Sequence, residues 1–256
     1  MRIISTLTEW QQLRQSLDLK LTVGFVPTMG NLHAGHASLL ELARAQNDIV
    51  VLSIFVNPTQ FNDPQDYQSY PRTHEADLAL AEKLNVDYVF MPEKSSLYPD
   101  NYTYQVSETE ISQYQEGAYR PGHFMGMLTV VLKLLLLVQA QRAYFGEKDH
   151  QQLQLIRGLV KAFFLNVDIV ACPIVRESTG LALSSRNSLL TAVERTQAEH
   201  FAQIFQQITL PCADIIQQLT RAGIQVDYVE DRDNRRCAAV KVGRIRLIDN
   251  HSLDQV

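Results

Sequence analysis

The stretch "LTVGFVPTMGNLHAGHASLLELARAQ", Leu21–Gln46, decides the predicted fold. Its first part, "LTVGFVPT", is a short apolar run rich in β-branched residues, which is typical of a buried strand. After a turn that contains glycine, "HASLLELARAQ" places Leu39, Leu40 and Ala43 at the spacing of one helix face. The stretch therefore predicts a strand, a turn and a helix in immediate succession.

The same alternation continues along the chain. Apolar runs predict further strands at 48–56, 86–92, 143–146 and 167–175, and amphipathic or apolar patterns predict helices at 73–84, 126–139 and 149–164. The strands are apolar on both faces, which is typical of a parallel sheet covered by helices on both sides. We therefore expect a doubly wound α/β fold that binds its ligands at the carboxyl ends of the strands.

The pattern changes after about residue 174. Helices are predicted at 191–208 and 213–223, and the segment 226–250 alternates like a small antiparallel hairpin with charged edges. We expect two domains, 1–174 and 175–256, of which the second is smaller and of the α+β class. The segment "VRESTGLALSSRNS", which starts at Val175, joins them.

Composition limits the possible functions. The chain has 256 residues, of which 46% are hydrophobic, so a sizeable core is expected. The net charge of −5 gives no electrostatic reason to expect a nucleic-acid partner. Three scattered cysteines form no disulfide framework and suit reduced thiols in the cytoplasm. We expect no signal peptide, because the N-terminus lacks a basic region followed by a long apolar core. We expect no membrane span, because Lys133 interrupts the most apolar run, 127–140, which is also shorter than the ~20 residues that a span needs.

Two histidines lie where the helix after the first strand begins. His33 and His36 stand beside Gly30 and Gly35, which allow close backbone approach. A helix N-terminus favours anions, and imidazoles add further donors for phosphate oxygens. Two alternatives stay open. The HxxH spacing suits a metal, although no third ligand is evident nearby, and the histidines can also simply cap the turn.

Two later segments offer phosphate ligands as well. "FGEKDHQQL" repeats the order of strand, glycine and charged helix start, and it contains Lys148. "LALSSRN" offers Ser184, Ser185 and Arg186, and an arginine can grip phosphate with two hydrogen bonds. Taken alone, the "FGEKDHQQL" segment is equally well explained as a solvated cluster of charges. The "LALSSRN" segment alone is equally well explained as a helix N-cap followed by a surface arginine. The convergence of three segments favours a nucleotide ligand.

The motifs together resemble a known family. "PTMGNLHAGH", "VNPTQF", "RPGHF", "FGEKDHQQL", "VRESTGLALSSRN" and "RLIDN" occur in the order and approximate spacing of the pantothenate synthetase family, from near Val26 to Asn250. The "HAGH" and "LSSR" segments also resemble the HIGH and KMSKS signatures of the wider nucleotidylyltransferase superfamily. The resemblance implies a Rossmann-like ATP- and pantoate-binding domain at 1–174 and a small C-terminal lid domain at 175–256.

The resemblance also implies an activity. Pantoate would attack the α-phosphorus of ATP to give pantoyl adenylate and pyrophosphate, and β-alanine would then displace AMP to give pantothenate. Mg²⁺ would accompany the phosphates, with Asp149 as a possible neighbour, and the family predicts a homodimer. Two alternatives are a nucleotidylyltransferase of the same superfamily and a non-catalytic nucleotide-binding scaffold.

Site residues carried over from the resemblance fall into three groups. His33, His36, Lys148 and Arg186 are expected to be catalytic. Gln60 and Gln152 are expected to bind pantoate, and Gln60 also β-alanine. The predicted ATP-binding residues are Met29, Gly30, Asn31, Leu32, His33, Ala34, Gly35, His36, Gly146, Glu147, Lys148, Asp149, Val175, Leu183, Ser184, Ser185 and Arg186.

Overall fold

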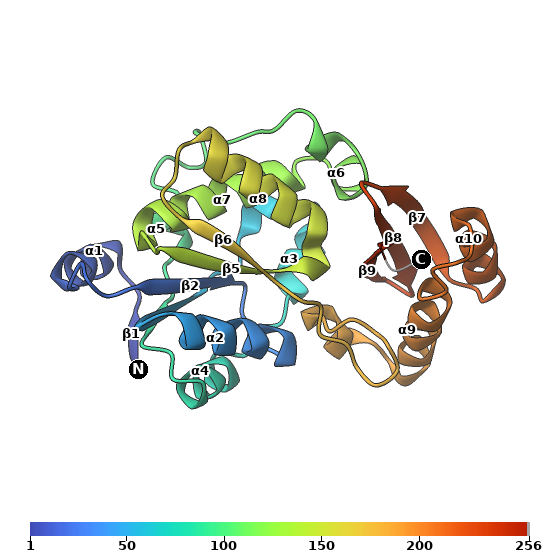
Figure 1. Cartoon of the computed structure of the whole chain (residues 1–256), viewed down its shortest axis with the longest axis horizontal. Coiled ribbons are helices and arrows are strands. Elements are labelled where there is room, and N and C mark those ends of the chain that lie inside the picture. Colours follow the sequence, from blue (N-terminus) through green and yellow to red (C-terminus); the bar gives the residue numbers. More distant parts are fainter. Residues whose placement is uncertain (255–256) are drawn as a thin grey trace. The chain divides into compact units, whose positions relative to one another are not determined.

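The predicted strands form one parallel sheet in the computed structural model, which describes residues 1–254 (Figure 1). Within these residues the sheet has six strands in the order β1-β4-β3-β2-β5-β6, and every neighbouring pair is parallel. The strands are β1 (Arg2–Ile4), β2 (Val23–Thr28), β3 (Ile49–Ile54), β4 (Tyr88–Phe90), β5 (Arg142–Gly146) and β6 (Asp168–Cys172). The doubly wound α/β prediction is confirmed.

The order of the strands gives the sheet a switch point between β2 and β5. From β2 the chain winds through β3 to β4 on one side, and later through β5 to β6 on the other. Loops that leave two such neighbouring strands diverge at their carboxyl ends, which is where open α/β sheets bind ligands. The histidine-containing turn follows β2 directly, and the "GEKD" segment includes the last residue of β5.

Side chains on the central strands alternate between two apolar layers. Phe25 and Val51 pack on one side with α7 and α8, and Val26 and Leu52 pack on the other with α2 and α4. All four side chains are at most 1% exposed, which explains why these strands read as continuous apolar runs. The helices of this part are α1 (Leu7–Ser16), α2 (Ala34–Gln46), α3 (Pro64–Ser69), α4 (His74–Lys83), α5 (Lys94–Leu97), α6 (Glu116–Tyr119), α7 (His123–Val138) and α8 (His150–Ala162), with short 3-10 helices η1 (Pro58–Gln60) and η2 (Ile111–Gln113).

One strand and one helix begin or end at other residues than predicted, and a proline and a glycine next to them explain the differences. β6 stops at Cys172 and not at Val175, because Pro173 follows and has no N–H for a sheet hydrogen bond. α7 starts at His123, earlier than expected, because Gly122 precedes it with a left-handed φ of 81° and acts as the N-cap. The strand β1 was not predicted.

The C-terminal part contains more sheet than expected. The predicted antiparallel pairing is confirmed, but the segment forms three strands where a two-stranded hairpin was expected: β7 (Gln225–Arg232), β8 (Arg235–Val242) and β9 (Ile245–Ser252). Two tight turns divide it, since Asp233 and Asn234 adopt φ of 50° and 58° and Gly243 adopts φ of 57°. Helices α9 (Ala192–Phe205) and α10 (Cys212–Arg221) complete this part, with 3-10 helices η3 (Glu147–Asp149) and η4 (Ser185–Leu189).

The contacts within the chain define two compact units. The first contains Met1–Gly146 and Gln151–Cys172, and the second contains Glu147–His150 and the chain from Pro173 onward. The short segment Glu147–His150 belongs with the second unit because it contacts β9. The predicted domain boundary after residue 174 stays a prediction. No helix within residues 1–254 is both long enough and apolar enough to span a membrane.

Candidate active site

Two histidines cap α2 in the first unit. Nδ1 of His33, the N-cap residue, accepts a hydrogen bond from the backbone N–H of Gly35 at 3.1 Å, and Nδ1 of His36 accepts one from the backbone N–H of His33 at 3.3 Å. The ring centroids lie 4.1 Å apart. Imidazoles thus fill both positions of a capping box, where Ser or Thr and Glu are usual. His33 and His36 therefore cap α2, which was one of the alternatives that the sequence offered.

The cap also fixes the tautomer of both rings. An Nδ1 that accepts a hydrogen bond carries no proton, so the neutral ring carries its proton on Nε2. Each imidazole therefore has an Nε2–H donor at the N-terminus of α2, where the helix dipole favours anions. Capping and ligand binding use different nitrogens and are compatible.

A buried carboxylate holds the turn that precedes this cap. Asp77 on α4 is 1% exposed, and its oxygens accept hydrogen bonds from the backbone N–H groups of Asn31 (3.0 Å) and Leu32 (2.7 Å). The Thr73 hydroxyl donates to the same carboxylate at 3.1 Å. Gly30 allows this approach, because its φ is +77° and a Cβ there would lie 3.0 Å from the Asp77 carboxylate. The predicted ATP loop is thus tied to α4.

Gln60 closes the 3-10 helix η1 that follows β3. Its side-chain carbonyl accepts a hydrogen bond from Asn57 Nδ2 at 2.9 Å, and its NH₂ group lies 3.4 Å from Met29 Sδ. The structure therefore brings together Gln60 and Met29, two residues that were predicted from separate motifs. The contact with Asn57 sets which way the amide points.

Asn57 is the centre of a buried polar network. It is 1% exposed, and its Oδ1 accepts hydrogen bonds from the hydroxyls of Tyr98 (2.8 Å) and Thr59 (3.0 Å). Its Nδ2 also donates to the carbonyl of Gly126 at 3.2 Å. A Cβ on Gly126 would lie 2.2 Å from the Thr59 carbonyl, so only glycine lets α7 pack this close to η1. Burial raises the pKa of Tyr98 to about 12.

Neighbouring glutamines on α8 have different surroundings. Gln151 is 5% exposed, and it accepts a hydrogen bond from the backbone N–H of Glu116 (3.0 Å) and donates to the carbonyls of Ile111 (2.6 Å) and Tyr114 (2.8 Å). Gln152 is half-buried at the next position of the helix. Gln151 therefore holds the loop that contains η2, while the side chain predicted to bind pantoate is the more accessible one.

Lys148 lies in η3, in the second unit. The backbone carbonyls of Glu147 and Lys148 accept hydrogen bonds from Asn250 Nδ2 at 3.1 Å and 2.7 Å. The Arg235 guanidinium donates to Asn250 Oδ1 and lies 4.0 Å from the Glu147 carboxylate. The segment that carries Lys148 is therefore fixed through its backbone by β9.

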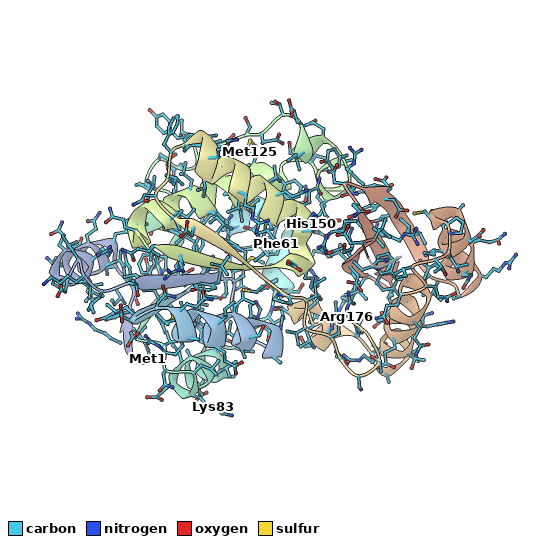
Figure 2. All side chains as sticks on the ribbon, viewed as in Figure 1. Met1, Phe61, Lys83, Met125, His150 and Arg176 are labelled. Atoms are coloured by element: carbon cyan, nitrogen blue, oxygen red, sulfur yellow. The ribbon has the colours of Figure 1, made fainter. Side chains whose placement is uncertain are left out.

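The "VREST" and "LSSR" segments lie together in the same unit. The backbone N–H of Leu183 donates to the carbonyl of Val175 at 3.0 Å, so two predicted ATP-binding residues are paired. Ser184 caps η4 by accepting a hydrogen bond from the backbone N–H of Arg186 at 3.3 Å. Arg176, which is labelled in Figure 2, follows Val175 in the sequence.

Comparison with known proteins identifies the family. The family model described as pantoate-beta-alanine ligase matches residues 2–252. Curated pantothenate synthetases from Coxiella burnetii (strain RSA 331 / Henzerling II) and Legionella pneumophila (strain Lens) are 54% and 53% identical to the chain. These alignments cover 97% of the chain and 96% of the first relative, and 99% of the chain and 100% of the second. The chain belongs to the pantoate–β-alanine ligase family.

Solved structures of this family share the fold. The pantoate-beta-alanine ligase from Francisella tularensis, complexed with beta-gamma ATP and beta-alanine, superposes with a TM-score of 0.96 at 42% identity, covering 99% of this chain and 98% of that one. A pantothenate synthetase from Thermus thermophilus gives a TM-score of 0.89 at 39% identity, covering 99% of each chain. The chain is a ligase that joins pantoate to β-alanine to form pantothenate, as its motifs predicted.

Some residues of this ligase with evident structural roles were not predicted. Asp77, Asn57 and Gln151 fix the loops and turns around the candidate site, and Asn250 lay in the quoted "RLIDN" motif without an assigned role. No local pattern marked Asp77, because the backbone N–H groups that it accepts from, those of Asn31 and Leu32, lie 46 and 45 residues earlier in the chain. Among residues 1–254, no three His, Cys, Asp or Glu side chains gather as metal ligands would.

Proposed function

We propose that this ligase activates pantoate as an adenylate with ATP and then transfers the pantoyl group to β-alanine. The observation that supports this route most is the reciprocal cap of His33 and His36. It sets two Nε2–H donors at a helix N-terminus that follows β2, beside the switch point of the sheet. Donors arranged in this way suit phosphate oxygens that gain charge as pantoate attacks the α-phosphorus.

The first step needs charge stabilisation more than proton transfer. A pantoate carboxylate is already ionised at neutral pH, so it attacks without a general base, and the α-phosphate-to-pyrophosphate bond breaks as the new acyl–phosphate bond forms. In the second step the amine of β-alanine attacks the acyl carbon, loses a proton, and AMP leaves. His33 and His36, together with Lys148 and Arg186, are the proposed phosphate-contacting groups. Such preorganised donors are usually the largest catalytic contribution.

Other predicted site residues complete the proposal. ATP is bound by Met29–His36, Gly146–Asp149, Val175 and Leu183–Arg186. These residues supply backbone N–H groups and hydroxyls as well as charged side chains. Gln60 and Gln152 bind pantoate, and Gln60 also lies near β-alanine. Neutral amides suit this task, because they hydrogen-bond hydroxyls and a carboxylate without neutralising the nucleophile. The contacts of Gln60 with Asn57 and Met29 support a fixed amide orientation.

Mg²⁺ fits this donor set as a companion of the phosphates. No group of three metal-binding side chains occurs within residues 1–254, and Mg²⁺ is usually held by one or two carboxylates plus substrate phosphates. Asp149 is the carboxylate that would help to hold it. When bound, the ion would neutralise phosphate charge.

The remaining assignments concern the whole molecule. We keep 1–174 as the ATP- and pantoate-binding domain and 175–256 as a lid domain, and the family leads us to propose a homodimer. Cys172, Cys212 and Cys237 form no disulfide with one another, which supports a reducing, cytoplasmic location. Light scattering tests the dimer, and a monomer at micromolar concentration would contradict it.

Exchange of labelled pyrophosphate into ATP tests the adenylate route. Pantoate alone should support exchange, because adenylate formation is reversible and β-alanine enters only afterwards. Lys148→Ala should slow exchange by ~10²-fold, on the scale of other lost electrostatic contacts. Lys161→Ala, which removes an exposed lysine at the end of α8, is the matched control. Exchange that requires β-alanine from the start would contradict the route, and a nucleotidylyltransferase would require a phosphorylated acceptor in place of pantoate.

A further inference from the structure

Asn250 on β9 holds the segment that carries Lys148 through its side-chain NH₂ group. It is 2% exposed, and its single NH₂ group donates to two successive carbonyls, those of Glu147 at 3.1 Å and Lys148 at 2.7 Å. Its Oδ1 accepts from the guanidinium of Arg235. An NH₂ group has two hydrogens, so both are used, and the arginine fixes which end of the amide faces η3.

The backbone of Asn250 is held just as firmly. Its N–H donates to the carboxylate of Asp249 at 2.7 Å, and its carbonyl accepts from Arg176 Nη2 at 3.1 Å. Arg176 and Asp249 also form a two-bond ion pair at 2.6 Å and 2.9 Å, in which the Asp249 side chain is 1% exposed. A two-bond pair of an arginine with a carboxylate is strong and also fixes the relative geometry of its two partners.

The same arginine links this network to the second ATP-binding segment. The backbone of Arg176 pairs with Ala182, the residue before Leu183, and its side chain donates to the carbonyl of Gly180 at 3.0 Å. Hydrogen bonds therefore join the "VREST" and "RLIDN" motifs within the second unit. Through Arg176 this network reaches the residue that precedes the "LSSR" segment. Through Asn250 it binds the carbonyls of Glu147 and Lys148.

We infer that Asn250 is a positioning residue of the ligase reaction, which acts by holding the backbone of Glu147 and Lys148 so that the Lys148 ammonium meets the phosphates of ATP. This inference rests on the proposed role of Lys148. Asn250 acts through the lysine and not on the substrate itself. A lysine has a long, mobile side chain, so the placement of its backbone largely decides where its charge can reach. A shift of about 1 Å in a group that stabilises charge can cost ~10²-fold in rate.

A pair of single variants and their double variant test the inference. Asn250→Ala should lower pantoate-dependent pyrophosphate exchange by ~10-fold or more through kcat, and leave the KM for pantoate unchanged. Lys148→Ala should lower exchange by ~10²-fold. If Asn250 acts only through Lys148, adding Asn250→Ala to Lys148→Ala should lower exchange no further. A merely structural role would make the two losses multiply.

Two further variants keep the test decisive. Ser252→Ala is the matched control on β9, because its hydroxyl contacts Asp254 at its own end of the strand. If Asn250→Ala unfolds, Arg235→Met serves in its place, since it leaves Asn250 present and removes two supports of this segment, the donor to Asn250 Oδ1 and the ion pair with Glu147. It should show a smaller loss with the same dependence on Lys148. Far-UV circular dichroism and thermal unfolding establish that each variant folds.

The outcomes separate the inference from the function on which it rests. Full exchange in Lys148→Ala would overturn the role of Lys148 and the inference with it. A defect in Lys148→Ala beside wild-type exchange in folded Asn250→Ala would overturn the inference alone. Multiplied losses in the double variant would do the same, because Asn250 would then act independently of the lysine.

Discussion

The carboxylate of Asp77 on α4 accepts a 2.7 Å hydrogen bond from the backbone N–H of Leu32, which lies 45 residues earlier in the chain. A second hydrogen bond from the backbone N–H of Asn31 completes a clamp on the loop that precedes the histidine cap. The loop follows a strand and begins a helix, so its N–H groups lie outside the regular hydrogen-bond pattern of either element. One buried carboxylate satisfies both.

Asp77→Asn tests this clamp with almost no change in shape. An amide NH₂ placed against a backbone N–H cannot accept its hydrogen bond, so the variant should lose about 2–3 kcal/mol of stability. The KM for ATP should rise and the KM for pantoate should change less, because the clamp holds the predicted ATP loop. Urea unfolding and steady-state kinetics measure the two effects. Glu75→Gln, an exposed neighbour on the same helix, is the control, and an equal effect in both variants would contradict the clamp.

His33→Asn separates capping from phosphate binding. Asparagine is a good N-cap residue, so the variant should keep the stability of α2, whereas His33→Ala should lose about 1 kcal/mol. Neither side chain offers the imidazole Nε2–H, so both variants should slow adenylate formation. Thermal unfolding measures the capping role, and pyrophosphate exchange measures the role in phosphate binding. Normal exchange in a stable His33→Asn variant would limit His33 to capping.

His36→Ala addresses the other half of the cap. We expect slower adenylate formation by about 10²–10³-fold, as for other lost donors to developing charge, with the fold intact. Elemental analysis of the purified protein is the control for the metal alternative. Zinc that is present in the wild type and absent from the variant would favour a metal role over phosphate binding.

Much of the fold could be predicted because its strands are buried on both faces. A strand such as β3, in which every residue is buried, leaves a continuous apolar run that a single sequence displays directly. The histidine-containing turn was also found, because a strand, a glycine and a helix start are local features. Strand β1 was missed, since it is three residues long and depends on pairing with the distant β4.

The supporting contacts of the candidate site could not be predicted in the same way. Asn250 is hydrogen-bonded to Lys148, 102 residues earlier in the chain, and Asn57 to Gly126, 69 residues later. Contacts between residues so far apart in the chain produce no periodic pattern in the sequence. Gln151 and Gln152 are adjacent and chemically identical, so only the geometry of α8 separates the structural glutamine from the accessible one.

This pair of glutamines provides a sharp comparison. Gln152→Ala should raise the KM for pantoate far more than the KM for ATP, since a lost hydrogen bond to a buried polar group costs roughly 1–3 kcal/mol. Gln151→Ala should instead lower stability, because it leaves the carbonyls of Ile111 and Tyr114 without this donor. Steady-state kinetics and thermal unfolding distinguish the two. An unchanged KM for pantoate in Gln152→Ala would remove this residue from the proposed site.

The buried hydroxyl of Tyr98 makes stability depend on alkaline pH. Tyr98 is 3% exposed and donates to Asn57 Oδ1 at 2.8 Å, and burial raises its pKa to about 12. An unfolded tyrosine ionises near pH ~10, so between these values the unfolded state releases a proton that the folded state keeps. Stability should therefore be fully present below pH ~10 and fall above it, by about 1.4 kcal/mol per pH unit for this one group.

Tyr98→Phe tests this pH dependence. The variant has no phenolic proton, so it should lose about 1 kcal/mol at neutral pH with its hydrogen bond to Asn57, yet its stability should fall less steeply than that of the wild type above pH ~10. Urea unfolding of each protein at pH ~9 and pH ~11 gives the change in its free energy of unfolding with pH. Tyr104→Phe, which removes a tyrosine that is 78% exposed, controls for the loss of a hydroxyl. Equal slopes in the wild type and Tyr98→Phe would mean that Tyr98 ionises as readily in the folded chain as in the unfolded one. The network around Asn57 would then not be closed to water, and Gln60 would have no rigid support from it.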